Sequence, residues 1–220
     1  MTLELILGPM FCGKTEELIR RVDRETVVKK KVIAFKPSLD RRYSSDFIVS
    51  HSKARLKAVP LDKTSKIAWH LRKAGRVDVI AFDEIQFFDE GMIEFCRQYA
   101  NDPNIEVIAS GLNLDFRREP FKFKGSKKHI GEIMPLAHIT NLRAKCTYEK
   151  EGGQMCDHGA DYTQRLVDGK PAHYNDPLIL VGASEAYAAR CLSHHFVPGK
   201  DRINIHYWKS ADPYFLQHNT

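Results

Sequence analysis

The sequence predicts an α/β fold in which a parallel β-sheet is covered by helices, followed by a small, loop-rich C-terminal domain. Two observations predict the sheet. Short apolar runs of strand length alternate with segments of helical period, and the first run ends in a glycine-rich loop that opens a helix. Such alternation gives right-handed β-α-β crossovers, which place helices on both faces of a parallel sheet. The second domain is predicted by the glycines, cysteines and histidines that gather after residue 138.

The predicted elements follow in order along the first half of the chain. Residues 3–7 form an apolar run that suits a buried strand, and Leu18, Ile19 and Val22 are spaced to share one face of a helix that starts near Thr15. Residues 32–35 form a second strand, which Pro37 stops. Further along, residues 67–73 and 91–99 have helical spacing, and residues 77–82 and 105–109 are strand candidates.

The loop after the first strand, residues 8–15, reads G-P-M-F-C-G-K-T, a complete phosphate-binding G-x-x-x-x-G-K-T motif. Glycines let the backbone curl so that N–H groups point at phosphate oxygens, and the following helix adds its positive N-terminal end. Lys14 can reach the β- and γ-phosphates, and the Thr15 hydroxyl can bind Mg²⁺. We therefore expect an ATP-binding loop made of Gly8, Pro9, Met10, Phe11, Cys12, Gly13, Lys14 and Thr15.

Acidic residues close the strand candidate at residues 77–82. The carboxyl ends of parallel strands face the ligand crevice, so Asp83 can hold the magnesium shell while Glu84 acts as a base. The alternative is a pair of solvated acids that cap the next helix. Beyond the second strand, Arg42 can stabilise charge on a transferring phosphoryl group, and Asp40 can accept a hydrogen bond from a sugar hydroxyl.

The composition of the chain bears on whether it binds nucleic acid, a membrane or a metal. The formal charge of +6 permits nucleic-acid binding, but apart from residues 29–31 and 122–128 the basic residues are scattered. Because a clustered footprint is missing, we expect no stable nucleic-acid partner. No apolar stretch approaches the length of a membrane span, so no membrane partner is expected either. Five cysteines without a secretory signal favour reduced thiols or a metal site, and a cytoplasmic location.

Five motifs occur in order along nearly the whole chain: G-P-M-F-C-G-K-T, D-R-R-Y-S-S, D-E-I-Q-F-F, G-L-N-L-D-F-R-R-E-P-F and V-G-A-S-E-A-Y-A-A-R-C. Together they resemble the cytosolic-type (type II) thymidine kinases, and the D-E-x-Q-F-F and G-A-S-E-x-Y blocks are more specific than the phosphate-binding loop. The resemblance implies that the 5′-hydroxyl of thymidine attacks the γ-phosphorus of ATP, which gives thymidine monophosphate and ADP. It also implies a homotetramer that works in nucleotide salvage.

The resemblance assigns further site residues. Glu84 matches the catalytic base. Arg42 matches a phosphate-contacting arginine, and Asp40 is its neighbour. Gln86 matches a glutamine near the nucleoside, and we group it with Asp83 among the ATP-binding residues. The apolar walls around the base correspond to Met10, Phe87, Leu112, Phe116 and Phe121. The loop that closes over thymidine corresponds to Leu178, Leu180, Val181, Gly182 and Tyr187.

A metal site is the other inherited feature. Cys191 and His194 have the Cys-x-x-His spacing of a zinc ligand pair. By the resemblance, a structural Zn²⁺ is held by Cys146, Cys156, Cys191 and His194. Nine residues separate Cys146 from Cys156, more than in the family, so residues 147–155 are interpreted as an insertion. His158 or His195 stays open as an alternative ligand, and Cys96 is expected in the core.

These assignments divide the chain into a nucleotide-binding α/β domain (residues 1–137), a small zinc and nucleoside-loop domain (138–200) and a C-terminal tail (201–220). Two other classes remain open. A RecA-like ATPase acting on nucleic acid would share the phosphate-binding loop and the acid pair, but needs stacking aromatics along a nucleic-acid path. A non-enzymatic zinc-knuckle binding module is disfavoured by the intact Lys14, Thr15, Asp83 and Glu84.

Overall fold

The centre of the molecule is a parallel sheet. A computed structural model describes residues 2–39, 46–178 and 187–200 of the chain. The sheet has six strands in the order β5-β2-β6-β7-β1-β8, and every neighbouring pair is parallel. The predicted α/β class is therefore confirmed. The strands are β1 (Leu3–Leu7), β2 (Val32–Pro37), β5 (Val59–Leu61), β6 (Val79–Phe82), β7 (Glu106–Gly111) and β8 (His138–Asn141).

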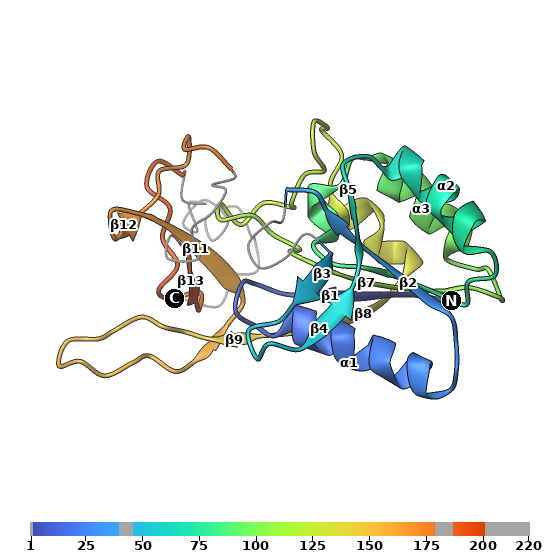
Figure 1. Cartoon of the computed structure of the whole chain (residues 1–220). Coiled ribbons are helices and arrows are strands. Elements are labelled where there is room, and N and C mark those ends of the chain that lie inside the picture. The colour runs from blue at the N-terminus through green and yellow to red at the C-terminus, as the bar shows by residue number, and fades with distance from the viewer. Residues whose placement is uncertain (1, 40–45, 179–186, 201–220) are drawn as a thin grey trace, which may run out of the picture.

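Helices cover both faces of this sheet, as Figure 1 shows. On one face lies α1 (Lys14–Val27), whose apolar stripe is buried against the sheet. On the other lie α2 (Ile67–Ala74) and α3 (Gly91–Tyr99), which share a second and larger core with the opposite side chains of the strands. The alternation of side chains along each strand explains this division, because successive residues point to opposite faces. In β1, for example, Ile6 belongs to the α1 side and Leu5 and Leu7 to the other.

Some boundaries differ from the prediction. The apolar run at residues 77–82 begins as a strand only at Val79, because the Asp78 side chain accepts a hydrogen bond from the Lys31 amide at 2.8 Å and so caps the neighbouring strand. Between β2 and β6 the chain forms three short strands that were not predicted. They are β3 (Phe47–Val49) and β4 (Arg55–Lys57), which form an antiparallel hairpin, and β5, where Pro60 is tolerated because the strand is at the sheet edge.

The part after residue 141 forms a smaller module beyond the carboxyl ends of the central strands (Figure 1). Its strands are β9 (Ala144–Lys145), β10 (Gly159–Ala160), β11 (Tyr162–Val167), β12 (Lys170–Pro171) and β13 (Tyr187–Arg190). The expected division at residue 137 stays a prediction. The four residues of β8 are bonded to β1, so the central sheet continues beyond that point.

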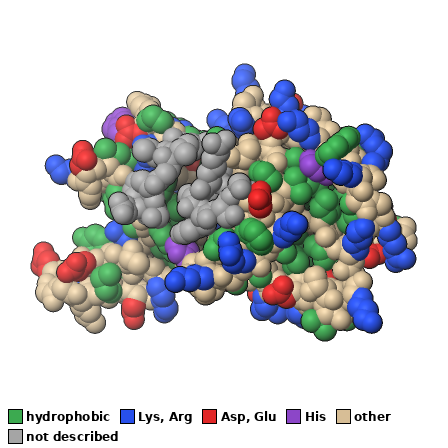
Figure 2. Space-filling model, in the orientation of Figure 1, with side chains coloured by type: hydrophobic (Ala, Val, Ile, Leu, Met, Phe, Trp, Pro, Cys, Tyr) green, Lys and Arg blue, Asp and Glu red, His purple; other side chains and the backbone are tan. Residues whose placement is uncertain are grey.

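The surface gives two further observations. On the face in Figure 2, Lys and Arg side chains are spread among acidic and apolar ones rather than gathered in one patch. In the described ranges, no helix combines the length and apolar character that crossing a bilayer requires.

Candidate active site

The phosphate-binding loop turns sharply between β1 and α1. Gly8 has a φ of 153°, and a Cβ at this position would lie 2.4 Å from the Leu142 carbonyl oxygen and 2.7 Å from Cys12 Sγ. Only glycine fits so close an approach. Gly13, with a φ of 85°, then directs the chain into α1, so the loop amides lie over the positive end of a long helix.

The two polar side chains of the motif point back over the loop and toward β6. Lys14 is buried, and its Nζ donates a hydrogen bond of 2.6 Å to the Pro9 carbonyl oxygen. The Thr15 hydroxyl faces the Asp83 carboxylate at 3.4 and 3.5 Å from its two oxygens. A hydroxyl and a carboxylate set opposite each other are ligands suited to Mg²⁺. The structure therefore brings the predicted magnesium ligands together.

Asp83 is buried at the carboxyl end of β6 and accepts hydrogen bonds from other groups besides Thr15. The Glu84 amide donates to Asp83 Oδ1 at 3.1 Å, and the Ser110 hydroxyl donates to the same oxygen. Both donors stabilise the ionised carboxylate and fix its direction. Ser110 was missed from the sequence. It lies one residue past the predicted strand 105–109, and a polar residue at the end of an apolar strand was the available signal.

Glu84 has a left-handed backbone, with φ 49° and ψ 48°, which is uncommon for a non-glycine residue. Its Oε2 accepts a hydrogen bond of 2.6 Å from Gln86 Nε2. Gln86 is fully buried, and its Oε1 accepts from the Leu112 amide at 3.0 Å. A Cβ at Gly111 would lie 2.4 Å from this Oε1, so the glycine makes room for the glutamine. The glutamine thus holds the Glu84 carboxylate from a fixed position.

The described apolar residues expected to line the nucleoside site lie in two clusters that Leu178 joins. Phe87 and Phe121 meet edge to face, with ring centroids 5.5 Å apart. Leu178 contacts both the large core beneath the sheet and a smaller cluster around Phe116. Met10 and Leu112 belong to the large core as well. Tyr187 begins β13, where it pairs with Arg165. The remaining expected residues, Asp40, Arg42, Leu180, Val181 and Gly182, lie outside the described residues.

The phosphate-binding loop also touches the small module. The Met10 amide donates a hydrogen bond of 2.9 Å to the Thr163 hydroxyl in β11. Cys12 packs against the cluster of alanines and cysteines in that module, and burial raises the pKa of its thiol. Thr163 was missed because no local pattern links it to a loop 153 residues away in the chain.

The expected zinc ligands come together in the module. The ligand atoms of Cys146, Cys156, Cys191 and His194 all lie within 4.8 Å of one another. His194 Nδ1 lies 3.7 Å from Cys146 Sγ and 3.3 Å from Cys191 Sγ, and the sulfur atoms of Cys156 and Cys191 are 3.9 Å apart. Ligands of one tetrahedral Zn²⁺ lie about 3.7 Å from one another. Three sulfurs and one imidazole nitrogen therefore fit a structural zinc.

Neither alternative ligand belongs to this cluster. His195 Nε2 instead lies 3.3 Å from the Thr163 carbonyl oxygen, and burial lowers the pKa of His195 to about 4. The residues between Cys146 and Cys156 form a hairpin, in which the Cys156 amide donates to the Tyr148 carbonyl and the Lys150 amide to the Gln154 carbonyl, both at 2.8 Å. The hairpin brings the two distant cysteines side by side.

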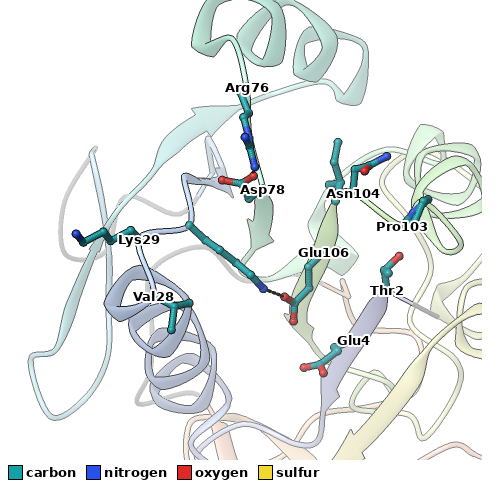
Figure 3. Close-up of a pocket in the computed structure, with 11 residues that line it drawn as sticks. Thr2, Glu4, Val28, Lys29, Arg76, Asp78, Pro103, Asn104 and Glu106 are labelled. Atoms are coloured by element: carbon teal, nitrogen blue, oxygen red, sulfur yellow. Dashed lines mark hydrogen bonds and ion pairs between the residues drawn. The ribbon is translucent and has the colours of Figure 1, made fainter.

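A separate cavity of about 460 Å³ opens at the amino ends of the central strands (Figure 3). Two of the cations that line it have partners, since Lys30 donates to Glu106 at 3.0 Å and Arg76 to Asp78 at 2.9 Å. Ligands of parallel sheets bind at the carboxyl ends instead, where the phosphate-binding loop lies. We therefore assign no substrate to this cavity.

The sheet, the loop and the paired carboxylates define a P-loop α/β protein that carries the parts needed for phosphoryl transfer. A family model described as thymidine kinase matches residues 1–195, and the chain belongs to the thymidine kinase family. The resemblance drawn from the motifs is confirmed at the level of this family. Membership implies a nucleoside kinase, that is, a phosphotransferase, and supports a thymidine kinase role.

Proposed function

We propose that the protein transfers the γ-phosphoryl group of ATP to the 5′-hydroxyl of thymidine, which gives thymidine monophosphate and ADP. The observation that carries the proposal is the Glu84 carboxylate, held by Gln86 beside Asp83 at the end of β6. A carboxylate there can orient the attacking hydroxyl and accept its proton late in a loose transition state. Family membership supplies the nucleoside class.

The other groups bind and orient. When ATP enters, Lys14 exchanges the Pro9 carbonyl for phosphate oxygens, and backbone N–H groups of the loop bind the same phosphates. Thr15 and Asp83 would hold Mg²⁺, which would neutralise negative charge on the β- and γ-phosphate oxygens. Arg42 and Asp40 are proposed to contact the phosphates and the sugar. The base is proposed to lie against Met10, Phe87, Leu112, Phe116 and Phe121, under Leu178, Leu180, Val181, Gly182 and Tyr187.

Zinc has a structural role in this proposal. Cys146, Cys156, Cys191 and His194 fill all four positions of a tetrahedral ion, so no position is open for a substrate. The three-part division of the chain, the homotetramer, the cytoplasmic location and the part in nucleotide salvage rest on the resemblance and are proposed with it.

The test is a phosphoryl-transfer assay with ATP and Mg²⁺ across the common nucleosides, with Lys14→Ala as the control for contaminating kinases. Thymidine should react far faster than deoxycytidine or deoxyadenosine, because each buried polar group left unpaired by the wrong base costs about 1–3 kcal/mol. Equal rates with all nucleosides would contradict the proposal. ATP hydrolysis stimulated by single-stranded DNA and not by thymidine would favour the RecA-like alternative, and failure to bind ATP would favour the binding module.

A further inference from the structure

Two arginines enclose the ring of Phe116. The guanidinium carbon of Arg117 lies 5.0 Å from the centre of this ring, and that of Arg165 lies 5.6 Å from it. Phe116 itself is buried with Ala172 and Val197. A guanidinium near an aromatic ring is attracted by the ring's negative face, and the attraction is stronger where water is excluded.

The same two arginines hold one short backbone segment. Arg117 Nη2 donates a hydrogen bond of 2.7 Å to the Asp176 carbonyl oxygen, and Arg165 Nη1 donates to the carbonyl of the next residue, Pro177. Leu178 follows directly and packs on Phe116. The two arginines therefore contact both the Phe116 ring and the backbone that leads to Leu178.

The neighbourhood fixes the arginines in turn. The Asp115 carboxylate accepts hydrogen bonds from the amides of Arg117 and Glu119 at 2.8 and 3.0 Å, which sets the backbone of the turn. Glu119 accepts from the Tyr174 hydroxyl at 2.7 Å. The Arg117 guanidinium also lies 5.2 Å from the Tyr174 ring. The turn at residues 115–119 and the 174–178 segment are thus linked by several side-chain contacts.

Stability alone does not account for this choice of residues. Arg165 is 2% exposed, and among the ion pairs of the described residues none includes it. The Nε atoms of both arginines are buried without a hydrogen-bond partner in the described part of the chain. A buried donor without a partner destabilises, and an apolar side chain of similar volume would avoid that cost. The arrangement therefore points to a function that needs fixed positions.

We propose that Arg117 and Arg165 are positioning residues for the nucleoside, because they hold Phe116 and the 176–178 segment in place before substrate binds. This inference rests on the proposed function, since it takes Phe116 and Leu178 as walls of the nucleoside site. A wall that is already ordered loses no conformational freedom when the nucleoside binds. Its order therefore increases the affinity for the nucleoside. The geometry assigns the effect to thymidine and not to ATP.

The kinetic test compares Arg165→Met, Arg165→Lys and Arg117→Gln with Arg143→Gln, a control that removes an exposed arginine paired with Asp161. We call Arg117 and Arg165 the clamp. In the three clamp variants, the KM for thymidine should rise about tenfold, which is what loss of a charged hydrogen bond produces. The KM for ATP and kcat at saturating thymidine should change less than about twofold. Arg165→Lys should not restore binding, because an ammonium lacks the planar fork. A fall in melting temperature with an unchanged KM for thymidine would overturn the proposal.

A second measurement separates this inference from the proposed function. Amide hydrogen exchange at Asp176 and Leu178 should be about tenfold faster in the clamp variants than in the wild type and Arg143→Gln, with no nucleoside present. Unchanged exchange would overturn the clamp. If exchange is faster in the variants but the protein does not phosphorylate thymidine, the proposed function and the nucleoside role are both contradicted. The same result would still show that the two arginines hold the 176–178 segment.

Discussion

The central sheet and the small module are stabilised in different ways. The sheet has two cores, rich in leucine, isoleucine, valine and phenylalanine, one on each face. In the module, the buried cluster around the expected zinc ligands consists of three alanines and three cysteines, and a smaller one holds Ala172 and Val197 with Phe116. Small side chains bury little apolar surface, and a unit of this size usually needs a cross-link or a metal. From this comparison we predict that the sheet, with its phosphate-binding loop, folds without a metal, whereas the module needs one at its Cys/His cluster.

The largest expected effect comes from the metal. We predict one zinc per chain, and its removal should unfold the module while the sheet stays folded, because binding of a structural zinc contributes about 10–16 kcal/mol in small zinc domains. Limited proteolysis with and without a chelator would measure this, together with elemental analysis. New cleavage sites should fall after residue 141, where the sheet ends.

Two variants provide the control for that prediction. Cys191→Ser removes a ligand and should reproduce the effect of the chelator. Cys96→Ala removes a cysteine of the sheet core, whose pKa is raised to about 12 by burial, and should leave the zinc content unchanged. The predicted difference between the two regions would be contradicted by purified protein that contains no zinc. It would also be contradicted if the module resisted protease equally well with and without the chelator.

The next effect concerns chemistry on the sheet. Glu84→Gln keeps the shape of the side chain and can still accept the hydrogen bond from Gln86, but it loses the proton acceptor. Removal of a general base typically costs about 10²–10⁴-fold in rate. We therefore expect kcat to collapse, with the affinities for thymidine and ATP nearly unchanged. Steady-state kinetics and direct binding measurements would check both.

Asp83→Asn is the variant to compare with Glu84→Gln, because Asp83 immediately precedes Glu84 and faces Thr15. It should weaken the dependence of the rate on magnesium. Near wild-type turnover in Glu84→Gln would show that another group is the base, with Asp40 the next candidate. If Glu84 only caps the following turn, its loss would instead lower stability by about 1 kcal/mol and leave catalysis intact.

The sequence predicted the parts of the site that depend on local pattern. Lys14 and Thr15 follow an apolar strand, and Asp83 and Glu84 end another. The rule that parallel strands present their carboxyl ends together was enough to bring the two pairs into one place. Glu84's left-handed backbone was not foreseen, because it arises from the turn into the 3₁₀ helix that follows β6.

Contacts between distant segments could not be predicted. Thr163 meets the phosphate-binding loop only because β11 is placed beside it by the module. The zinc ligand set came from the resemblance, and the long spacing between Cys146 and Cys156 left His158 and His195 open. The hairpin that closes this spacing depends on backbone hydrogen bonds within residues 148–156, whose sequence has no clear strand period.

The smallest expected effect concerns the contribution of the 147–155 hairpin to holding the metal. The Tyr148 ring stacks on His194, a proposed zinc ligand, with centroids 4.1 Å apart and planes at 7°. Arg190 Nη1 donates a hydrogen bond of 2.7 Å to the hydroxyl of the preceding residue, Thr147. A stacked pair of this kind contributes about 0.5–1.5 kcal/mol. Tyr148→Leu should therefore speed zinc release to a chromogenic chelator by about two- to tenfold. Tyr148→Phe keeps the ring and should release zinc at the wild-type rate. Equal rates in the leucine and phenylalanine variants would show that the hairpin only spaces the cysteines, and that His194 is held by the Cys-x-x-His turn alone.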